Sequence, residues 1–452
     1  MTKTFDLETA TAVETARAVR DGTTSALEAC EAAITRIEAR DVRINAVVVR
    51  DFERAIAAAK RIDKTRTKDD ACPLLGVPMT VKESNDVAGL PSTWGMPVFK
   101  DLKVHDDGVA VARLKAAGAV ILGKTNAPVA LADWQTVNPI YGRTVNPHDP
   151  ERSPGGSSGG AAAALAAGMI PLELGSDIGG SIRIPAHMCG VFGHKPTYGV
   201  VPLKGHGFPG TDGIDVPLAV LGPMARSAED LRIALGVVAG PLPGAGYKLD
   251  LPPARRTKLR EFRVLVLDRH PSAATASSVR DALAAFADKL EQVGVAVTFG
   301  STAVPDLAAA HADYTKMLMA VTTRGTPGVQ PITAHAWMDL EDEQMRVARR
   351  WQALFDDFDI VLTPPFGTPA FPHDDNPNWS ERKLMIDGEL TRYGAQVAWA
   401  GVATYPGLPA TALPIDKTPQ GLPIGVQAIG PKFADRTTIA FAELLEREGL
   451  TA

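Results

Sequence analysis

The sequence predicts an α/β fold with a central sheet, because short apolar runs with strand character alternate with segments of helical periodicity. Strand-like runs occupy residues 46–49, 264–267, 295–299 and 360–363, and a helical stretch spans residues 278–293. This alternation is typical of layered proteins in which helices cover a sheet. The chain has 452 residues, of which 45% are hydrophobic, so it can bury a large core.

The N-terminal part, residues 1–65, is predicted to be mainly helical. Ser25 and Glu28 form a capping-box pattern at the start of one helix. Apolar residues then recur at helical spacing: Leu27, Cys30, Ile34 and Ile37. Further along, the small apolar residues 161–170 predict a core helix, and this stretch is too short to span a bilayer.

Two glycine-flanked serine segments lie in the middle of the chain. Residues 155–160 contain Ser157, and residues 175–186 contain Ser181 directly after two glycines; Lys82 precedes both in an apolar stretch. A serine hydroxyl attacks a carbonyl only when a base takes its proton, and the developing oxyanion needs backbone N–H donors. Either segment alone is equally well explained as a loop, but both together with the lysine indicate a serine hydrolase that uses lysine as its base.

The combination resembles the amidase signature family, which is defined by a Ser-cisSer-Lys triad, and the resemblance covers nearly the whole chain. The spacings from Lys82 to Ser157 and from Ser157 to Ser181 fit the family pattern. Other stretches match as well: residues 118–126, 190–197, 222–227 and 407–410.

The resemblance implies a single amidase signature domain over residues 1–452, built on a large mixed central β-sheet covered by helices on both faces. It places the catalytic core motifs in residues 76–230. Variable segments that shape the substrate pocket are expected at residues 89–107 and at about 303–339.

Site residues follow from the same resemblance. Ser181 is the expected acyl-accepting nucleophile, Ser157 relays its proton, Lys82 is the base, and the Gly156–Ser157 peptide bond is expected to be cis. The oxyanion-hole N–H donors are expected to be Ile178, Gly179, Gly180 and Ser181. The supporting residues are Ser158, Asp177 and Arg183, the last two as a clamp on the oxyanion loop or as an ordinary ion pair. Candidate substrate-pocket residues are Leu131, Trp134 and Ser176, although a lone Trp belongs equally well to a core.

Lysine acts as a base only when neutral, so the pKa of Lys82 must lie well below its ordinary value of about 10.4. Apolar neighbours in the sequence favour its burial. Glu83 and Asp86 count against a neutral Lys82 unless their side chains point elsewhere. With Lys82 as base, activity is expected to rise through roughly pH 7 to 9.

A rival interpretation starts from residues 155–159, which satisfy G-x-S-x-G, the nucleophile elbow of α/β-hydrolases, and would make Ser157 the nucleophile. An elbow requires an apolar strand running directly into it, whereas residues 146–154 are polar and interrupted by prolines. The elbow would also need an Asp and a His later in the chain, and no matching segment is found.

The predicted activity is hydrolysis of C–N bonds in small-molecule linear amides, aryl or alkyl, with carbamates (urethanes) and esters left open. The alternatives are a carbamate-specific hydrolase and the amidase-like subunit of a tRNA-dependent amidotransferase complex. No cofactor and no metal are implied, because the sequence lacks Walker A, HExxH and CxxC patterns.

The charge, the N-terminal residues and the cysteine count indicate the cellular compartment and the classes of partner that we expect. A net charge of −5 gives no basic footprint for nucleic acid, and the N-terminus lacks the pattern of an export signal. Three cysteines are too few for a disulfide scaffold. We therefore expect a cytoplasmic enzyme without a membrane or nucleic-acid partner. The resemblance also allows a homodimer, because proteins of this family often form homodimers.

Overall fold

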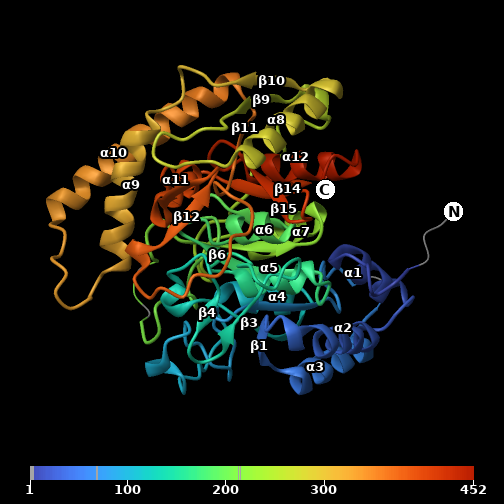
Figure 1. Cartoon of the computed structure of the whole chain (residues 1–452). Coiled ribbons are helices and arrows are strands. Elements are labelled where there is room, and N and C mark those ends of the chain that lie inside the picture. The colour runs from blue at the N-terminus through green and yellow to red at the C-terminus, as the bar shows by residue number, and fades with distance from the viewer. Residues whose placement is uncertain (1–4, 68–69, 212, 214) are drawn as a thin grey trace.

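An eleven-stranded mixed sheet runs through the molecule in the computed structural model, which describes residues 5–67, 70–211, 213 and 215–452 (Figure 1). Its strands lie in the order β1-β3-β2-β6-β8-β7-β14-β15-β11-β9-β10. Their bounds are β1 Val47–Arg50, β2 Pro78–Lys82, β3 Val120–Thr125, β6 Leu172–Asp177, β7 Phe192–Lys195, β8 Val220–Ala225, β9 Arg263–Val266, β10 Ala296–Phe299, β11 Ile360–Thr363, β14 Ala410–Lys417 and β15 Pro423–Ile429. Two small hairpins complete the strands: β4 Val137–Asn138 with β5 Gly142–Arg143, and β12 Lys383–Ile386 with β13 Glu389–Arg392.

The sheet is mixed because it joins two parallel groups through antiparallel strands. Strand β2 is parallel to both β3 and β6, and β9 is parallel to both β10 and β11. Between these groups, the pairs from β6 through β8, β7, β14 and β15 to β11 are antiparallel. The parallel trio β3-β2-β6 directs the carboxyl ends of its strands to one edge of the sheet, which is where such folds place their ligands.

Helices cover both faces of the sheet, so the predicted fold class is confirmed. One face carries α4 Val109–Ala116, α7 Ala228–Val238, α8 Ser277–Gln292 and α12 Asp435–Arg447. The other face carries α5 Gly159–Ala166 and α6 Arg183–Cys189. The N-terminal helices α1 Ala12–Asp21, α2 Ala26–Arg40 and α3 Phe52–Thr65 lie together at one end of the molecule, near β1 (Figure 1).

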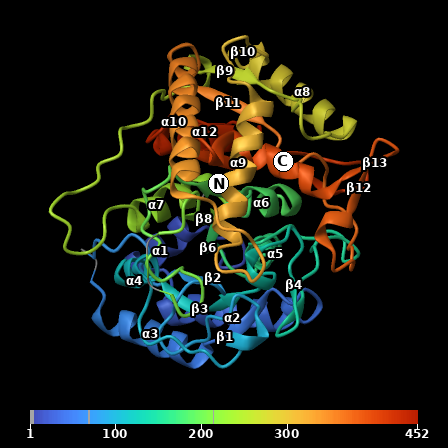
Figure 2. The same cartoon turned by 90° about the vertical axis from the view of Figure 1, so that its left-hand side faces the viewer.

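Two further helices lie on the side of the molecule that faces the viewer in Figure 2, and a third packs against one of them. Helices α9 Leu307–Thr322 and α10 Ala334–Asp357 pack as an antiparallel hairpin, and α11 Val397–Thr404 packs against α9. Their buried side chains join an aromatic-rich cluster that includes Tyr314, Trp351 and Trp399. Helix α11 itself is buried along its whole length.

Most elements predicted from the sequence are present within a residue or so of their expected bounds. The capping box is confirmed, because Ser25 and Glu28 cap α2 reciprocally. The core helix expected at residues 161–170 is wrong at both ends: α5 begins at Gly159 and ends at Ala166. It ends early because Gly168 adopts a left-handed conformation with φ of 67°, which a helix cannot continue through.

Candidate active site

Strand ends and glycine loops bring the expected triad residues to one edge of the sheet. Lys82 is the last residue of β2, and Asp177 is the last residue of the neighbouring parallel strand β6. Ser157 lies in the loop just before α5, and Ser181 lies in the loop between β6 and α6. All four side chains are buried.

Lys82 is held by two serine hydroxyls. Its Nζ is hydrogen-bonded to Ser157 Oγ at 2.6 Å and to Ser176 Oγ at 2.9 Å. Ser176 was expected in the substrate pocket, but its hydroxyl lies against the lysine amine. Among the residues that the structure describes, Ser181 Oγ makes no hydrogen bond, so the relay from Ser181 to Ser157 stays a prediction.

The Gly156–Ser157 peptide bond is cis, as the resemblance implied. Gly156 has no space for a side chain, because a Cβ there would collide with the backbone oxygen of Asp133. Ser158, expected as a supporting hydroxyl, lies at hydrogen-bonding distance from the backbone of Ser176, 3.3 Å from its oxygen and 3.4 Å from its nitrogen. Ser158 N also donates to Ser181 O at 3.1 Å, which ties the two serine segments together.

Asp177 and Arg183 form a buried clamp around the loop that carries Ser181. Arg183 donates Nη2 and Nε to Asp177 at 2.8 and 3.0 Å. Asp177 also accepts from the N–H groups of Gly180 and Ile182, at 2.9 and 3.0 Å. Burial opposes the charge on Asp177, but the guanidinium of Arg183 and these N–H donors outweigh it and lower the pKa of Asp177 to about 2. The carboxylate therefore remains charged and fixes the loop.

The clamp reaches residues that the sequence motifs did not indicate. Arg183 Nη1 donates to Gln427 Oε1 at 2.7 Å and to Ala400 O at 3.1 Å, and its Nη2 donates to Thr404 Oγ1 at 2.8 Å. These three partners come from β15 and α11, far along the chain, and no local sequence signal marks them.

Two aromatic side chains orient the peptide groups of the oxyanion loop. Tyr314 OH donates to Ile178 O at 2.6 Å, and Trp134 Nε1 donates to Gly179 O at 2.9 Å. In a trans peptide the carbonyl and the next N–H point in opposite directions. The N–H of Gly179 therefore points away from Tyr314, and the N–H of Gly180 points away from Trp134 toward Asp177.

Of the four expected oxyanion donors, Gly180 already uses its N–H on Asp177. The N–H groups of Ile178, Gly179 and Ser181 make no hydrogen bond among the described residues. The carbonyl of Gly180 accepts from Ile184 N at 2.7 Å, so the N–H of Ser181 points away from α6. Ile178, Gly179 and Ser181 are thus the donors that can meet an oxyanion without breaking the clamp.

Replacing Tyr314 with phenylalanine is expected to lower kcat by about tenfold with little change in KM, since the Ile178 carbonyl loses the donor that orients its peptide group. Steady-state kinetics on an active-site substrate measures this. Tyr405 is a matched control, because it is also buried on the same side of the molecule but its hydroxyl has no hydrogen-bond partner among the described residues. Equal effects of Tyr314→Phe and Tyr405→Phe would contradict the orienting role.

Burial makes Lys82 a weak base by ordinary lysine standards. It lowers the pKa of Lys82 to about 7, although the charges of Asp177 and Glu173 oppose the shift. No carboxylate lies within 4.0 Å of its amine in the described part of the chain. Glu83 points elsewhere: its carboxylate accepts from the N–H groups of Thr93 and Trp94 at 2.7 and 2.9 Å.

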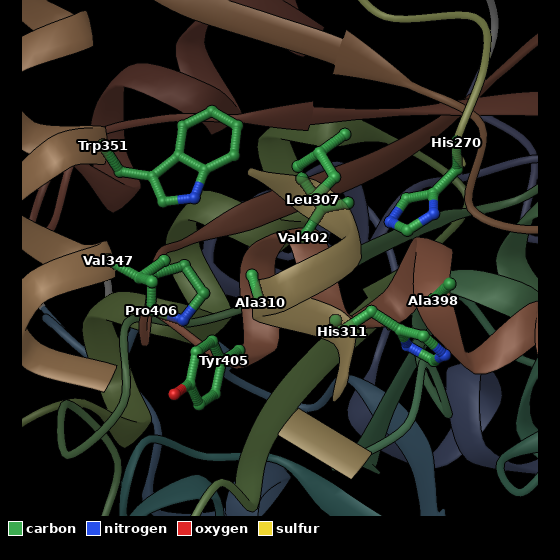
Figure 3. Close-up of a pocket in the computed structure, with 11 residues that line it drawn as sticks. His270, Leu307, Ala310, His311, Val347, Trp351, Ala398, Val402, Tyr405 and Pro406 are labelled. Atoms are coloured by element: carbon green, nitrogen blue, oxygen red, sulfur yellow. The ribbon is translucent and has the colours of Figure 1, made fainter. Parts of the chain in front are cut away.

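The remaining predicted pocket residues lie apart from an apolar cavity that the structure outlines. That cavity lies between α9, α10 and α11 and is lined by His270, Leu307, Ala310, His311, Val347, Trp351, Ala398, Gly401, Val402, Tyr405 and Pro406 (Figure 3). Leu131 is half-buried in the turn that precedes Trp134, and Trp134 packs against the rings of Phe366, Trp379 and Tyr393. Neither lines the cavity, and their role in a substrate pocket stays a prediction.

Several other features bear on the predicted class. No strand enters the Ser157 loop from residues 144–154, so the context of a nucleophile elbow is absent there. Over the described ranges, no group of His, Cys, Asp and Glu side chains could hold a metal ion. No helix in the described part of the chain is long and apolar enough to cross a membrane.

The chain is similar to known proteins along nearly its whole length. The family model Amidase matches residues 28–327 and 327–439. Indoleacetamide hydrolase of Bradyrhizobium diazoefficiens is 33% identical over 98% of this chain and 87% of its own length. One subunit of the glutamyl-tRNA(Gln) amidotransferase of Deinococcus radiodurans is 33% identical over 97% of both chains. The solved structure of 6-aminohexanoate cyclic dimer hydrolase with its substrate has a TM-score of 0.80 at 27% identity, covering 98% of this chain and 97% of the other.

The chain belongs to the amidase signature family. This is a family of hydrolases that act on C–N bonds, built on the mixed sheet with helices on both faces that is described above.

Proposed function

We propose that the protein is a serine amidohydrolase that cleaves the C–N bond of small-molecule amides through an acyl-enzyme on Ser181. The observation that carries the proposal is the buried amine of Lys82, with its pKa near 7, bonded at 2.6 Å to Ser157 Oγ beside the Ser181 loop. A neutral amine in this position can take a proton through a serine hydroxyl.

The reaction proceeds in two balanced steps. Ser181 Oγ attacks the carbonyl carbon while its proton passes through Ser157 to Lys82, and the oxyanion is met by the N–H groups of Ile178, Gly179 and Ser181. Collapse of the tetrahedral intermediate breaks the C–N bond, and the proton on Lys82 returns through Ser157 to the leaving amine. Water then attacks the acyl-enzyme, which releases the acid and regenerates Ser181.

The substrate is proposed to be a linear amide with an apolar acyl or amine group. Aryl amides, carbamates and esters share the same attack on a carbonyl, and none of the described residues selects among them. The relatives named above include both a hydrolase and an amidotransferase subunit. The second candidate function is therefore that of the amidase-like subunit of a tRNA-dependent amidotransferase complex. A cytoplasmic location and a homodimer stay part of the proposal; the three cysteines, all unpaired, are compatible with a reducing compartment.

The test is intact-protein mass spectrometry after reaction with a fluorophosphonate probe, followed by a panel of p-nitroanilides and p-nitrophenyl carbamates. One adduct on Ser181 and turnover of the anilides by the isolated chain support the amidase. Adduct formation without turnover of any panel member, restored only by partner subunits, would favour the amidotransferase.

The pH dependence of kcat/KM is expected to show an acid limb with a midpoint near pH 7. Lys82 must be neutral to accept a proton, and burial places its pKa at about 7, so activity is lost as pH falls through this value. A series of kcat/KM values from about pH 5.5 to about pH 9.5 on a neutral substrate measures the limb. A profile that is flat across this range when chemistry limits the rate would exclude Lys82 as the base.

A further inference from the structure

Strand β6 carries a buried carboxyl group that the triad does not use. Glu173 is 1% exposed, and its two oxygens are hydrogen-bonded to threonine hydroxyls, those of Thr80 and, at 3.1 Å, Thr125. No lysine or arginine nitrogen lies within 4.0 Å of it in the described part of the chain. A buried carboxylate without a cation is costly, so this environment favours the neutral acid.

The strand register places this carboxyl group on the same face of the sheet as Lys82. Glu173 lies opposite Thr80 on the parallel strand β2, and Lys82 follows two residues later on the same face. Thr125 lies opposite Lys82 on β3. By bonding to both threonines, the Glu173 carboxyl group reaches across β2 on the side from which the Lys82 side chain projects.

Other charged groups around Glu173 are absent or already paired. Helix α5, which packs over this face, consists of Gly, Ala and Leu, and the β8 residue opposite Glu173 is Met224. Asp177 is bound to its arginine. Lys124 lies on the opposite face of β3, where its amine bonds to Pro91 O. Lys82 is therefore the charged group that interacts with Glu173 among the described residues.

We propose that Glu173 is a neutral carboxylic acid in the active enzyme and that its neutrality keeps Lys82 an uncharged amine. The proposal rests on the role of Lys82 as base. Together the two side chains hold one proton, which can form a neutral acid with a neutral amine or a carboxylate with an ammonium group. The second arrangement would leave two buried charges without direct contact, which their weak attraction does not offset.

The pKa of Glu173 supports this assignment. Burial raises it to about 8, against the threonine hydrogen bonds and the charge of Lys82, which lower it. At neutral pH the acid is therefore protonated while much of Lys82 is already neutral.

The neutral state of Glu173 also affects the transfer of the proton from Lys82 to the leaving amine. After acylation begins, Lys82 carries the proton taken from Ser181 and must give it to the leaving amine. A carboxylate at position 173 would attract the ammonium group and hold the proton on Lys82. A neutral Glu173 leaves the ammonium group acidic, so it donates readily. Glu173 acts here as a positioning residue, because it touches neither the substrate nor the reacting atoms.

Infrared spectroscopy tests the protonation state directly. Glu173→Gln keeps the size, one acceptor and one donor of the neutral acid, and it cannot ionise. The difference spectrum between wild type and Glu173→Gln at neutral pH is expected to contain the carbonyl band of a protonated carboxylic acid, shifted in deuterium oxide. Carboxylate bands in its place would overturn the proposal. If the variant fails to fold, the same band followed in wild type with isotope-labelled glutamate from about pH 6 to about pH 10 gives the same decision.

The rate of labelling by the fluorophosphonate probe tests the link to Lys82. Under the proposal, wild type and Glu173→Gln share an acid-limb midpoint to within about 0.3 pH unit, because at the pH of this midpoint neither has a charge at position 173. If Glu173 were ionised, the variant would lose an attractive charge and its midpoint would fall by about one unit or more. Failure of the proposed function itself is recognised separately, because Lys82→Met would then keep the wild-type labelling rate whatever the infrared spectrum shows.

Discussion

Replacing Ser181 with alanine is expected to lower kcat/KM by about four orders of magnitude or more and to abolish labelling by the fluorophosphonate probe. The hydroxyl is the proposed nucleophile, and without it only the oxyanion donors and substrate binding remain to act. The side chain is small and buried, so its replacement leaves the Asp177–Arg183 clamp and the fold in place. Turnover of a p-nitroanilide and the intact mass of the probe adduct measure the two effects.

Ser227→Ala is the control for the loss of a serine hydroxyl. Ser227 caps α7 by accepting from Asp230 N, so its removal is expected to cost about 1 kcal/mol in the free energy of unfolding and to leave labelling unchanged. Ser157→Ala completes the set. A probe adduct that persists in Ser181→Ala but disappears in Ser157→Ala would identify Ser157 as the nucleophile. That result would support the interpretation of residues 155–159 as a nucleophile elbow.

Replacing Lys82 with methionine is expected to lower kcat/KM by about three to four orders of magnitude and to remove the acid limb near pH 7. Methionine matches the lysine stem in size and is tolerated in an apolar site, but it has no amine to accept the proton that Ser157 relays. Ser157 and Ser176 then lose their shared partner. The pH profile of the residual activity, measured together with thermal unfolding, separates loss of the base from loss of the fold.

Lys124→Met is a matched control for this change. Lys124 is also fully buried, and burial lowers its pKa to about 8, but its amine bonds to Pro91 O away from the serine residues. Its replacement is expected to lower stability without moving the midpoint of the acid limb. If Lys124→Met moved the limb and Lys82→Met did not, the assignment of the base would be wrong.

Local sequence predicted the parts of this fold that local forces determine. The reciprocal cap of Ser25 and Glu28 depends on residues three apart, and the strand at residues 360–363 depends on its own apolar run; both are present. The end of α5 was missed, because apolar composition continues to Ile170 while the left-handed Gly168 interrupts the backbone. An apolar composition indicates which residues are buried, but it does not indicate the backbone dihedral angle at which a helix ends.

The site was predictable only where motif and chemistry coincide. The cis bond before Ser157 and the burial of Lys82 followed from the family resemblance and from the need for a neutral amine. The orienting bond from Tyr314 to Ile178 O, and the engagement of Gly180 N–H by Asp177, depend on how distant segments pack. Glu173 has no distinguishing local signal, and only the register of β2 and β6 places it on the Lys82 face.

The clamp makes the loop that carries Ser181 depend on segments that lie far along the chain. Arg183 is held by Ala400 and Thr404 on α11 and by Gln427 on β15, and β15 is also the strand that joins β14 to β11 in the sheet. The loop that carries Ser181 precedes these supports in the chain, so it lacks them until α11 and β15 have been synthesised and have packed against it. The side-chain arrangement of the candidate site is therefore completed only when these later segments pack against the loop.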